Sequence, residues 1–466
     1  MPARPDNPAG GALSRSTNGA ARLGSPVTLE DTAVPAAPTP ETARTHAEDL
    51  ADFVAASPSS FHAAAEVARR LEGAGFAALQ ETDAWPEQAG KYLVVRDGAV
   101  IAWIVPQGAT ATTPVRVFGA HSDSPGFKLK PKPTTGRLGW LQAGVEVYGG
   151  PLLNSWLDRE LRLAGRLVLD DGSEVLAATG PLLRLPQLAI HLDRTANEGF
   201  ALDKQVHTQP VWGLGAPDSA DLLAELAASV DGAKVDAARI RGFDVVVADA
   251  ARGAVFGHDD AFLAAGRLDD LASVHAGVVA LAAAADGFDG DHIPMLAVFD
   301  HEEIGSATRS GAAGPFLEDV LERIGLSLGA DRAERMRAVA SSWCVSSDVG
   351  HSVHPNYAEK HDPAVRPVLG SGPILKINAN QRYATDGAGA AAWHGWCDAA
   401  GVTSQEFVSN NQVPCGSTIG PITATRLGIR TVDVGIPILS MHSARELAGV
   451  SDLHDLMRVA GAFFGG

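Results

Sequence analysis

The sequence is poor in cysteine and in long apolar runs, and each shortage excludes a class of protein. Its three cysteines, Cys344, Cys397 and Cys415, are far apart with no CxxC spacing, so we expect neither a disulfide framework nor a thiolate zinc site. No apolar run approaches the roughly 18 residues of a membrane span, and the N-terminus lacks the hydrophobic block of a secretory signal. We therefore expect a cytoplasmic protein that is neither exported nor membrane-anchored.

Positive charge is also in short supply. The chain has 37 lysines and arginines against 55 aspartates and glutamates, a formal net charge of −18. Such a surface repels nucleic acid and anionic membranes, so we expect neither as a partner. An anionic substrate would need a local cation or a metal ion to offset the repulsion.

The texture of the sequence divides its 466 residues into four segments. Residues 1–42 are rich in Ala, Pro, Gly, Ser and Thr without apolar periodicity, which predicts a disordered tail. Residues 43–130 open with two predicted helices and continue with strands. Short β-rich runs fill 131–257 and indicate an inserted β-rich domain. In 258–466, Ala-rich helices alternate with apolar strands, which predicts an α/β sheet covered by helices on both faces.

Several elements can be placed more closely. We predict helices over Thr45–Ala56 and His62–Ala74, and an Ala-rich helix over Leu271–Ala285. Apolar β-rich runs predict strands at Val115–Gly119 and Met295–Phe299.

Metal-ligating residue types follow four of the apolar runs directly. The runs end at His121, at the pair Glu302 and Glu303, at Asp348 and at His442. In open α/β sheets the ligand crevice lies outside the carboxyl ends of the strands, so these segments can converge on one site. A fifth segment, which contains Asp269, lies where the Ala-rich helix begins.

These residue types suit zinc, which binds imidazole nitrogen and carboxylate oxygen. Two such ions repel each other and need a bridging carboxylate and further anionic ligands, which Asp269, Glu303 and Asp348 can supply. Asp123 lies two residues beyond His121, on the same side of an extended backbone, where its carboxylate can orient the imidazole. Because adjacent side chains diverge, one carboxylate of the Glu302–Glu303 pair can bind metal while the other acts as general base.

Each of these residues also has a simpler explanation. A single histidine is commonly satisfied within a loop, and adjacent glutamates commonly form a solvated turn. The residue pattern by itself leaves both the metal site and these structural roles open.

Short motifs in a fixed order carry a more specific signal. They resemble the aspartyl aminopeptidase family of two-zinc metallopeptidases, which includes the yeast vacuolar aminopeptidase and bacterial and mammalian aspartyl aminopeptidases. The resemblance runs from about residue 48 to the C-terminus. The motifs are Ala120–Pro125, Asn154–Leu161, Ile190–Arg194, Arg267–Asp270, Asp300–Ser306, His351–Tyr357, Lys376–Tyr383, Cys415–Pro421 and Met441–Glu446.

The resemblance implies a zinc-peptidase-like α/β fold, in which helices sandwich a mixed sheet and an inserted β-rich domain mediates dimerisation. It also implies two divalent ions per subunit, expected to be zinc, although cobalt and manganese accept the same ligands. Glu302 would be the general base for a metal-activated water. The implied ligands are Asp269 as the bridge, His121 with Asp348 for one ion, and Glu303 with His442 for the other.

The resemblance further implies assembly and substrate. Dimers would build a tetrahedral dodecamer, and the inserted domain would send His191 into the neighbouring subunit's active site, where it contributes to catalysis and substrate binding. Lys376 matches the family lysine that is credited with binding acidic N-terminal residues of peptides, and Arg382 is a second choice. We therefore expect an aminopeptidase that removes N-terminal Asp and Glu.

Two alternative functions stay open at this point. Because the acidic preference depends on one lysine, the chain can instead be an aminopeptidase of broad or neutral specificity. It can also be a non-catalytic, self-assembling shell protein. An intact Glu302 and a full ligand set argue against the shell, which has no need of a general base.

Overall fold

The computed structural model describes residues 40–232 and 234–465. The predicted tail over 1–42 lies outside these residues, except for 40–42, which belong to the first helix. Among the described residues, no helix combines the length and the apolarity needed to cross a membrane. The helices are α1 (Pro40–Ala56), α2 (Ser60–Gly73), α3 (Leu222–Ala228), α4 (Leu268–Ala284), α5 (Phe316–Ser327), α6 (Arg332–Ala340), α7 (Gly387–Ala400), α8 (Ile419–Leu427) and α9 (Val450–Gly465).

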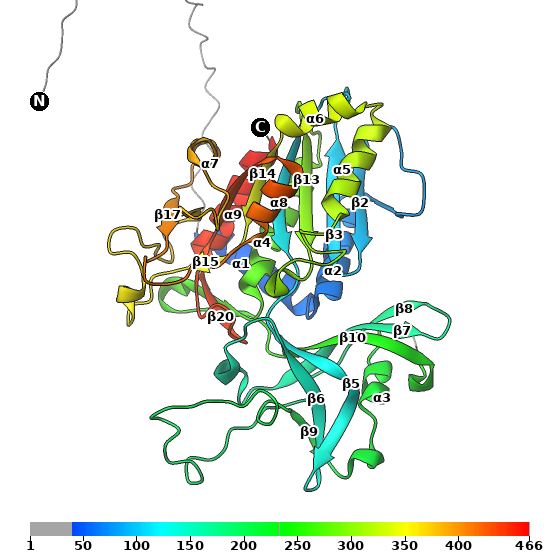
Figure 1. Ribbon diagram of the computed structural model, residues 1–466, viewed down its shortest axis with the longest axis vertical. Helices are drawn as coiled ribbons and strands as arrows, with labels where there is room; N and C mark the ends of the chain where they lie inside the picture. The colour runs from blue at the N-terminus through cyan, green and yellow to red at the C-terminus, as the bar shows by residue number, and fades with distance from the viewer. Residues whose placement is uncertain (1–39, 233, 466) are drawn as a thin grey trace, which may run out of the picture. The chain divides into compact units, whose positions relative to one another are not determined.

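A nine-stranded mixed sheet forms the centre of the α/β part (Figure 1). Strands β13, β4, β14 and β18 are its parallel middle, and β3 and β16 flank them in antiparallel orientation. Along the sheet the order is β1 (Ala77–Leu79), β2 (Gly90–Arg96), β3 (Ala99–Val105), β13 (Ile293–Phe299), β4 (Val115–His121), β14 (Trp343–Ser347), β18 (Arg430–Gly435), β16 (Ile374–Ile377) and β17 (Gln405–Val408).

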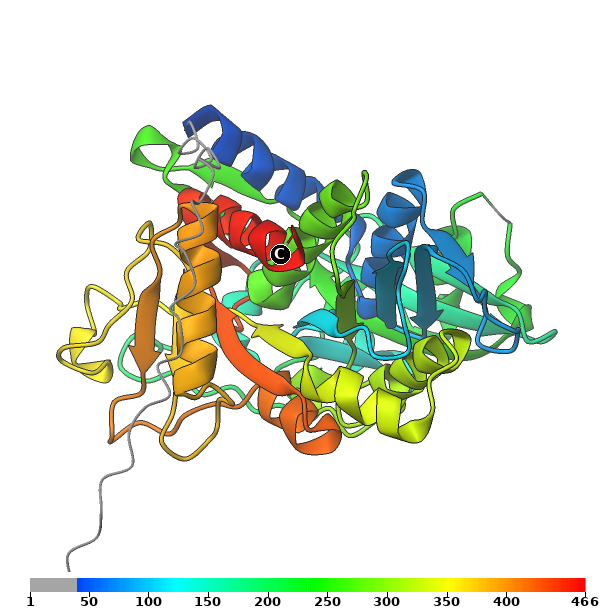
Figure 2. The same cartoon turned by 90° about the horizontal axis from the view of Figure 1, so that it is seen from above.

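Helices cover both faces of this sheet, as the view from above shows (Figure 2). One face packs against α1, α2, α4, α7 and α9, and the other against α5, with contributions from α6 and α8. Successive residues of β4 serve opposite cores: Phe118 faces the first and Val117 the second. This double burial explains why the central strands read as continuous apolar runs.

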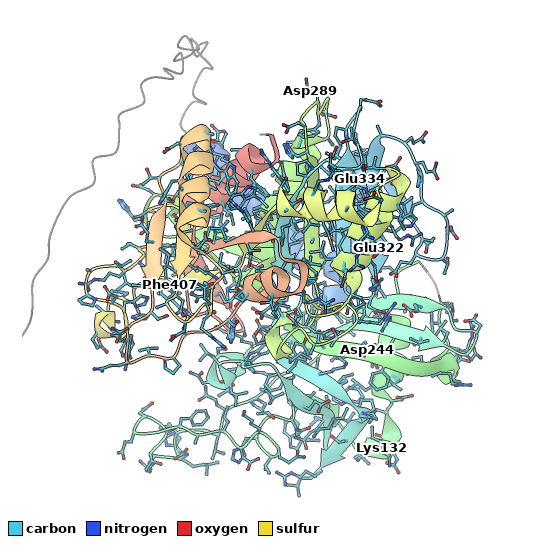
Figure 3. The ribbon with its side chains drawn as sticks, turned by 45° about the horizontal axis from the view of Figure 1, so that its top comes forward. Lys132, Asp244, Asp289, Glu322, Glu334 and Phe407 are labelled. Carbon is cyan, nitrogen blue, oxygen red and sulfur yellow. The ribbon has the colours of Figure 1, made fainter. Side chains whose placement is uncertain are left out.

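The β-rich part is a six-stranded antiparallel sheet that packs against α3. Its order is β8 (Glu174–Ala178), β7 (Leu161–Leu169), β10 (Ile240–Asp249), β5 (Gly126–Arg137), β6 (Trp140–Tyr148) and β9 (Val211–Leu214). In Figure 3, Asp244 lies near the α/β part and Lys132 at the far end of the sheet. Arg166 joins the two parts, because its guanidinium lies 2.9 Å from both Asp97 and Asp244.

A third sheet has five strands, which come from three separate stretches of the chain. Its order is β11 (Ala254–Phe256), β12 (Phe262–Ala265), β20 (Glu446–Gly449), β19 (Pro437–Leu439) and β15 (Gly350–His351). The strand β12 leads into α4, and the turn between β19 and β20 contains His442. This small sheet therefore positions two segments that the large sheet does not reach.

The predicted fold class is confirmed: the chain is α/β, with a mixed sheet between helices and a separate β-rich part. Predicted elements match observed ones with shifted ends, as α1 begins at Pro40 rather than Thr45 and β4 extends to His121. The strand β5 runs through the proposed boundary at residues 130 and 131. The domain boundaries and the dimerisation role stay predictions.

The close approach of α4 to the sheet gives a test of the packing. A Cβ atom at Gly277 would lie 2.6 Å from Cδ1 of Leu296 and 3.0 Å from Cδ1 of Phe118, whereas Gly461 in α9 has open space. We predict that Gly277→Ala lowers the free energy of unfolding by about 1–3 kcal/mol through overpacking. The matched Gly461→Ala should raise it by up to about 1 kcal/mol through helix propensity. Urea unfolding of both variants measures the difference; equal changes would contradict the packing argument.

Candidate metal centre

Three neighbouring parallel strands end at the same edge of the large sheet. Phe299 of β13 pairs with His121 of β4, and Gly119 of β4 pairs with Ser346 of β14. The residues that follow these strand ends are therefore brought side by side. His121 is the last residue of β4, Glu302 and Glu303 follow β13, and Asp348 follows β14.

The other two predicted ligands come from the segments attached to the small sheet. Asp269 lies in the first turn of α4, where its φ of −79° and ψ of 103° are not helical. The side chain is almost fully buried, with 4 % exposed. His442 lies in the turn between β19 and β20 with a φ of +66°. Both side chains reach the edge where the three strands end.

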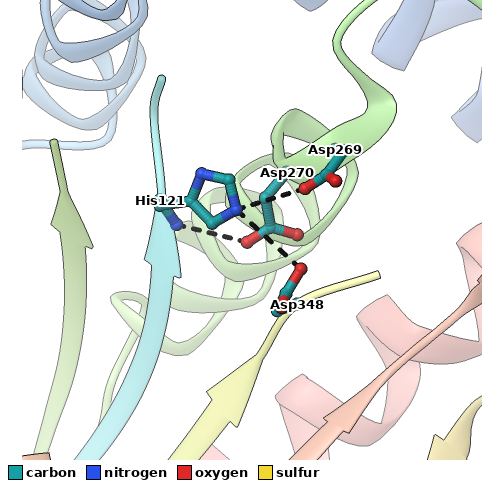
Figure 4. Close-up of side chains that lie close together, drawn as sticks. All are labelled: His121, Asp269, Asp270 and Asp348. Atoms are coloured by element: carbon teal, nitrogen blue, oxygen red, sulfur yellow. Dashed lines mark hydrogen bonds and ion pairs between the residues drawn. The ribbon is translucent and has the colours of Figure 1, made fainter. Parts of the chain in front are cut away.

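Asp269 lies between the two histidines. Its Oδ1 is 3.2 Å from Nε2 of His121, and its Oδ2 is 3.4 Å from Nε2 of His442. Nε2 of His121 is also 3.8 Å from Oδ1 of Asp348, as Figure 4 shows, and Nε2 of His442 is 3.4 Å from Oε2 of Glu303. One carboxylate thus faces two separate imidazole–carboxylate pairs.

Within residues 40–232 and 234–465, three overlapping groups have ligand atoms within 4.8 Å of one another and can hold a metal ion. Asp269 belongs both to a group with His121 and to a group with His442. All five predicted ligands are therefore brought together. The groups are His121, Asp269, Asp270 and Asp348; His121, Glu302 and Glu303; and Asp269, Glu303 and His442.

The electrostatics of this cluster favour a bound cation. Burial opposes protonation of His121, yet the carboxylates around it outweigh burial and raise the pKa of the imidazole well above its usual value. The pKa of His442 is raised to about 9: burial lowers it, and Asp269 more than compensates. Burial and repulsion from Asp269 raise the pKa of Glu303 well above its usual value. The site therefore holds more carboxylates than its histidines can neutralise.

The donor set fits zinc. Among the described residues, three buried carboxylate oxygens in the cluster have no hydrogen-bond partner: Oδ1 of Asp269, Oδ1 of Asp270 and Oε1 of Glu303. An unpaired buried carboxylate oxygen is costly unless it is hydrogen-bonded or coordinates a metal. The two imidazoles donate their Nδ1 hydrogens to the backbone carbonyls of Asp123 and Gly150, both at 3.0 Å, which leaves each Nε2 free for a metal.

Asp123 differs in detail from our prediction. We expected its carboxylate to accept a hydrogen bond from the imidazole of His121, but the ring lies closer to the backbone carbonyl of Asp123, at 3.0 Å, than to the carboxylate, at 3.5 Å. The carboxylate instead accepts hydrogen bonds from the backbone N–H groups of Glu302, at 2.9 Å, and Glu303, at 3.1 Å. Asp123 thus joins the β4 end to the turn that contains both glutamates.

Glu302 and Glu303 both belong to a group with His121, but Glu303 also lies beside His442, 3.4 Å from its Nε2. Glu302 stays partly accessible. Burial raises the pKa of Glu302 to about 7, and repulsion by nearby carboxylates adds to the effect. A carboxylate with a pKa near neutral can both accept and return a proton.

Two further acidic residues in the cluster had no role in our predictions. Oδ2 of Asp270 accepts a hydrogen bond from the backbone N–H of His121 at 3.2 Å. Glu446 accepts from the backbone N–H groups of Asp269, at 3.0 Å, and His442, at 2.7 Å. Their positions next to Asp269 and four residues after His442 were visible signals. The contacts from Asp270 to His121 and from Glu446 to Asp269, however, bring together distant parts of the chain.

The proposed substrate-binding residues lie in different surroundings. Lys376 is 2 % exposed, donates to the carbonyl of Val349 at 2.9 Å and lies 3.3 Å from Oδ2 of Asp348, so its ammonium group faces the metal-ligand cluster. Arg382 is exposed and donates to the carbonyl of Gly416. His191 is exposed in an irregular segment of the β-rich part and belongs to none of the ligand groups.

Comparisons with known proteins find relatives that match most of this chain. A 54 % identical relative, the probable M18 family aminopeptidase 2 of Streptomyces coelicolor, matches over 424 residues, 90 % of this chain and 98 % of the relative. The corresponding protein of Mycobacterium leprae is 44 % identical, over 90 % of this chain and 98 % of its own.

Solved structures share the fold. The structure of the Ape4 and Nbr1 complex superposes with a TM-score of 0.88 at 34 % identity, over 91 % of this chain and 86 % of that one. The dodecamer of yeast (S. cerevisiae) mApe1 superposes with a TM-score of 0.78 at 30 % identity, over 90 % and 96 %. Residues 53–464 match the family described as aminopeptidase I zinc metalloprotease (M18). The chain therefore belongs to the M18 family of zinc metallo-aminopeptidases.

Proposed function

We propose that this aminopeptidase holds two zinc ions and removes acidic residues from the N-termini of peptides. The observation that supports two ions is the carboxylate of Asp269, whose two oxygens face His121 and His442 separately. A carboxylate in that position can bridge two cations that would otherwise repel each other. The proposed ligands are His121 and Asp348 for one ion, Glu303 and His442 for the other, and Asp269 for both.

Zinc bound at this site would supply Lewis-acid chemistry, by polarising the scissile carbonyl and lowering the pKa of water. The chain's own residues then transfer the proton. Glu302 takes the proton of the attacking water and returns it to the leaving amine, which its raised pKa of about 7 permits. Asp123 positions Glu302 by accepting the hydrogen bond from its backbone N–H.

The acidic preference is proposed from Lys376. Its buried ammonium group lies beside Asp348, so it can attract a carboxylate of a substrate bound at the metal ligands. A buried charge exerts a stronger field than an exposed one, which favours Lys376 over the exposed Arg382.

The β-rich part is the proposed subunit contact. It exposes an unusual number of large apolar side chains, which a second copy of the chain can cover. We propose that dimers form through this surface and assemble into a dodecamer, and that His191 completes the partner's active site. The exposed side chains, with the fraction of each that is accessible, are Leu138 90 %, Trp140 49 %, Leu152 46 %, Leu188 60 %, Ile190 47 %, Leu192 75 %, Phe200 42 %, Val206 52 % and Leu214 74 %.

The first prediction concerns metal and base together. The purified protein should contain about two zinc ions per chain, and chelation should abolish peptide hydrolysis. Glu302→Gln should retain the zinc yet lower kcat by about 10²–10⁴-fold, because only the proton transfer is lost. Elemental analysis and turnover of Asp amides measure both. Near-normal hydrolysis by the variant would remove Glu302 from its role, and a metal-free, inactive wild type would favour a shell protein.

The second prediction concerns specificity. Lys376→Met keeps most of the side-chain volume and should lower kcat/KM on Asp and Glu amides by about tenfold to a hundredfold, with little change on Leu and Lys amides. Arg382→Met is the matched control and should leave kcat/KM unchanged on both the acidic amides and the Leu and Lys amides. An equal loss on all substrates, or loss of zinc, would assign Lys376 a structural role. High wild-type activity on Leu or Lys amides would support the broad-specificity alternative.

The third prediction concerns the shared active site. His191→Ala and Glu302→Gln should each be nearly inactive alone. Co-expressed in equal amounts, they should recover about a quarter of wild-type turnover, because a quarter of the sites then combine an intact Glu302 with the partner's intact histidine. A mixture as inactive as its components would show that His191 does not act across subunits.

A further inference from the structure

The end of strand β6 enters the metal centre from the β-rich part. Residues 148–152, here called the β6 turn, begin at Tyr148, which is the last residue of this strand and pairs with Gly126. The hydroxyl of Tyr148 donates to Oδ2 of Asp123 at 2.8 Å. The carbonyl of Gly150 accepts from Nδ1 of His442 at 3.0 Å, and the N–H of Leu152 donates to the carbonyl of His442 at 2.9 Å. One short segment therefore contacts both halves of the proposed two-metal site.

Tyr148 acts through Asp123. That carboxylate is 5 % exposed. It accepts hydrogen bonds from the backbone N–H groups of Glu302 and Glu303 and from the phenol of Tyr148. The phenol shares Oδ2 with the N–H of Glu303. Removing it would leave the carboxylate under-bonded in a buried setting and loosen the turn that contains Glu302 and Glu303.

Gly149 leaves room for the ligand Glu303. Its φ is +65°, and a Cβ atom there would lie 3.2 Å from Cβ of Glu303, 3.4 Å from the carbonyl oxygen of Glu303 and 3.5 Å from Cβ of Pro125. Any side chain at 149 would push Glu303 by a few tenths of an ångström. Distortions of this size matter for metal ligands, whose bond lengths vary by about 0.2 Å.

Gly150 sets the orientation of the other ligand. Its carbonyl takes the Nδ1 hydrogen of His442, so Nε2 is the nitrogen left to face Asp269 and Glu303. The second contact, from Leu152 to the carbonyl of His442, holds the backbone of the same residue. His442 is thus held by hydrogen bonds to both its imidazole ring and its main chain.

We propose that the β6 turn is a positioning element of the metal centre, with Tyr148 and Gly149 as its positioning residues. The inference deepens the proposed function and rests on its assignment of Glu303 and His442 to one ion. Tyr148 orders the turn that contains Glu302 and Glu303 through Asp123. Gly149 and Gly150 position the side chains of Glu303 and His442, which would hold one ion. The β-rich part therefore contributes directly to zinc affinity.

The first test compares two tyrosine variants of the full-length protein. Tyr148→Phe should weaken zinc binding by about tenfold or more, as loss of a group that orients metal ligands typically does. It should lower kcat with little change in KM. Tyr92→Phe is the matched control, because the hydroxyl of Tyr92 donates to the carbonyl of Gln88, outside the metal centre. Competition with a chromophoric zinc chelator measures affinity, and the melting temperature of the metal-free protein reports any general loss of stability.

The second test compares two glycines with the same backbone strain. Gly149→Ala and Gly139→Ala both place a side chain at positive φ, +65° and +81°, but Gly139 has open space around it. Gly149→Ala should lower the affinity for one of the two zinc ions by about tenfold or more and leave the other ion bound. Gly139→Ala should keep both at wild-type affinity.

The outcomes separate this inference from the proposed function. Tyr148→Phe and Gly149→Ala with wild-type zinc affinity and stoichiometry would overturn the positioning role while leaving the two-zinc proposal intact. Lower melting temperature of the metal-free variants without any change in zinc binding would overturn it equally. A wild-type chain that binds no zinc would overturn both proposals together.

Discussion

The carboxylate of Asp269 faces two imidazoles from distant parts of the chain, and the surrounding structure depends on this arrangement. Its oxygens lie 3.2 Å from His121 and 3.4 Å from His442, and its side chain is only 4 % exposed. A buried carboxylate pays a large desolvation penalty, which opposite charge must offset. Repulsion among the neighbouring carboxylates adds to this cost, which bound cations would offset.

The scaffold holds this cluster by backbone contacts rather than by packing alone. Asp123 and Glu446 accept hydrogen bonds from the N–H groups of residues that are proposed as ligands or as the base. Asp123 ties together segments that follow two strands of the large sheet, and Glu446 ties together segments attached to the small one. In the same way, β6 begins at the exposed Trp140 and ends at Tyr148 beside Asp123, so a single strand runs from the proposed subunit surface to the metal centre.

Much of the fold could be predicted because its signals are local. The strands β4 and β13 are buried on both faces, so they stand out as continuous apolar runs. The composition of α4, which is rich in alanine, likewise predicts a helix. Element ends were less accurate, since the last turn of a helix or the last pair of a strand depends on neighbours that the local pattern does not contain.

His121, Glu303 and Asp348 are brought together because parallel strands end at one edge of a sheet, a rule that converts sequence order into proximity. Asp269 and His442 reach the same edge from segments attached to the small sheet. Orientation was harder to predict. The carboxylate of Asp123 lies 3.5 Å from the imidazole of His121, but it accepts its hydrogen bonds from the backbone of Glu302 and Glu303. Lys376 is buried against Asp348. Tyr148 and Glu446 had no predicted role, because their contacts join residues far apart in the chain.

The amino-acid sequence by itself determined the α/β class, the strand ends that supply metal-ligating residues and, through its motifs, the family resemblance. These properties follow from local composition, periodicity and residue order. Only the tertiary structure decided that Asp269 lies between two histidines, that each imidazole turns its Nε2 inward and that the β6 turn contacts the cluster. Such contacts depend on the paths of three sheets through space, and hydrogen-bond geometry at this scale is set by distances that no single segment encodes.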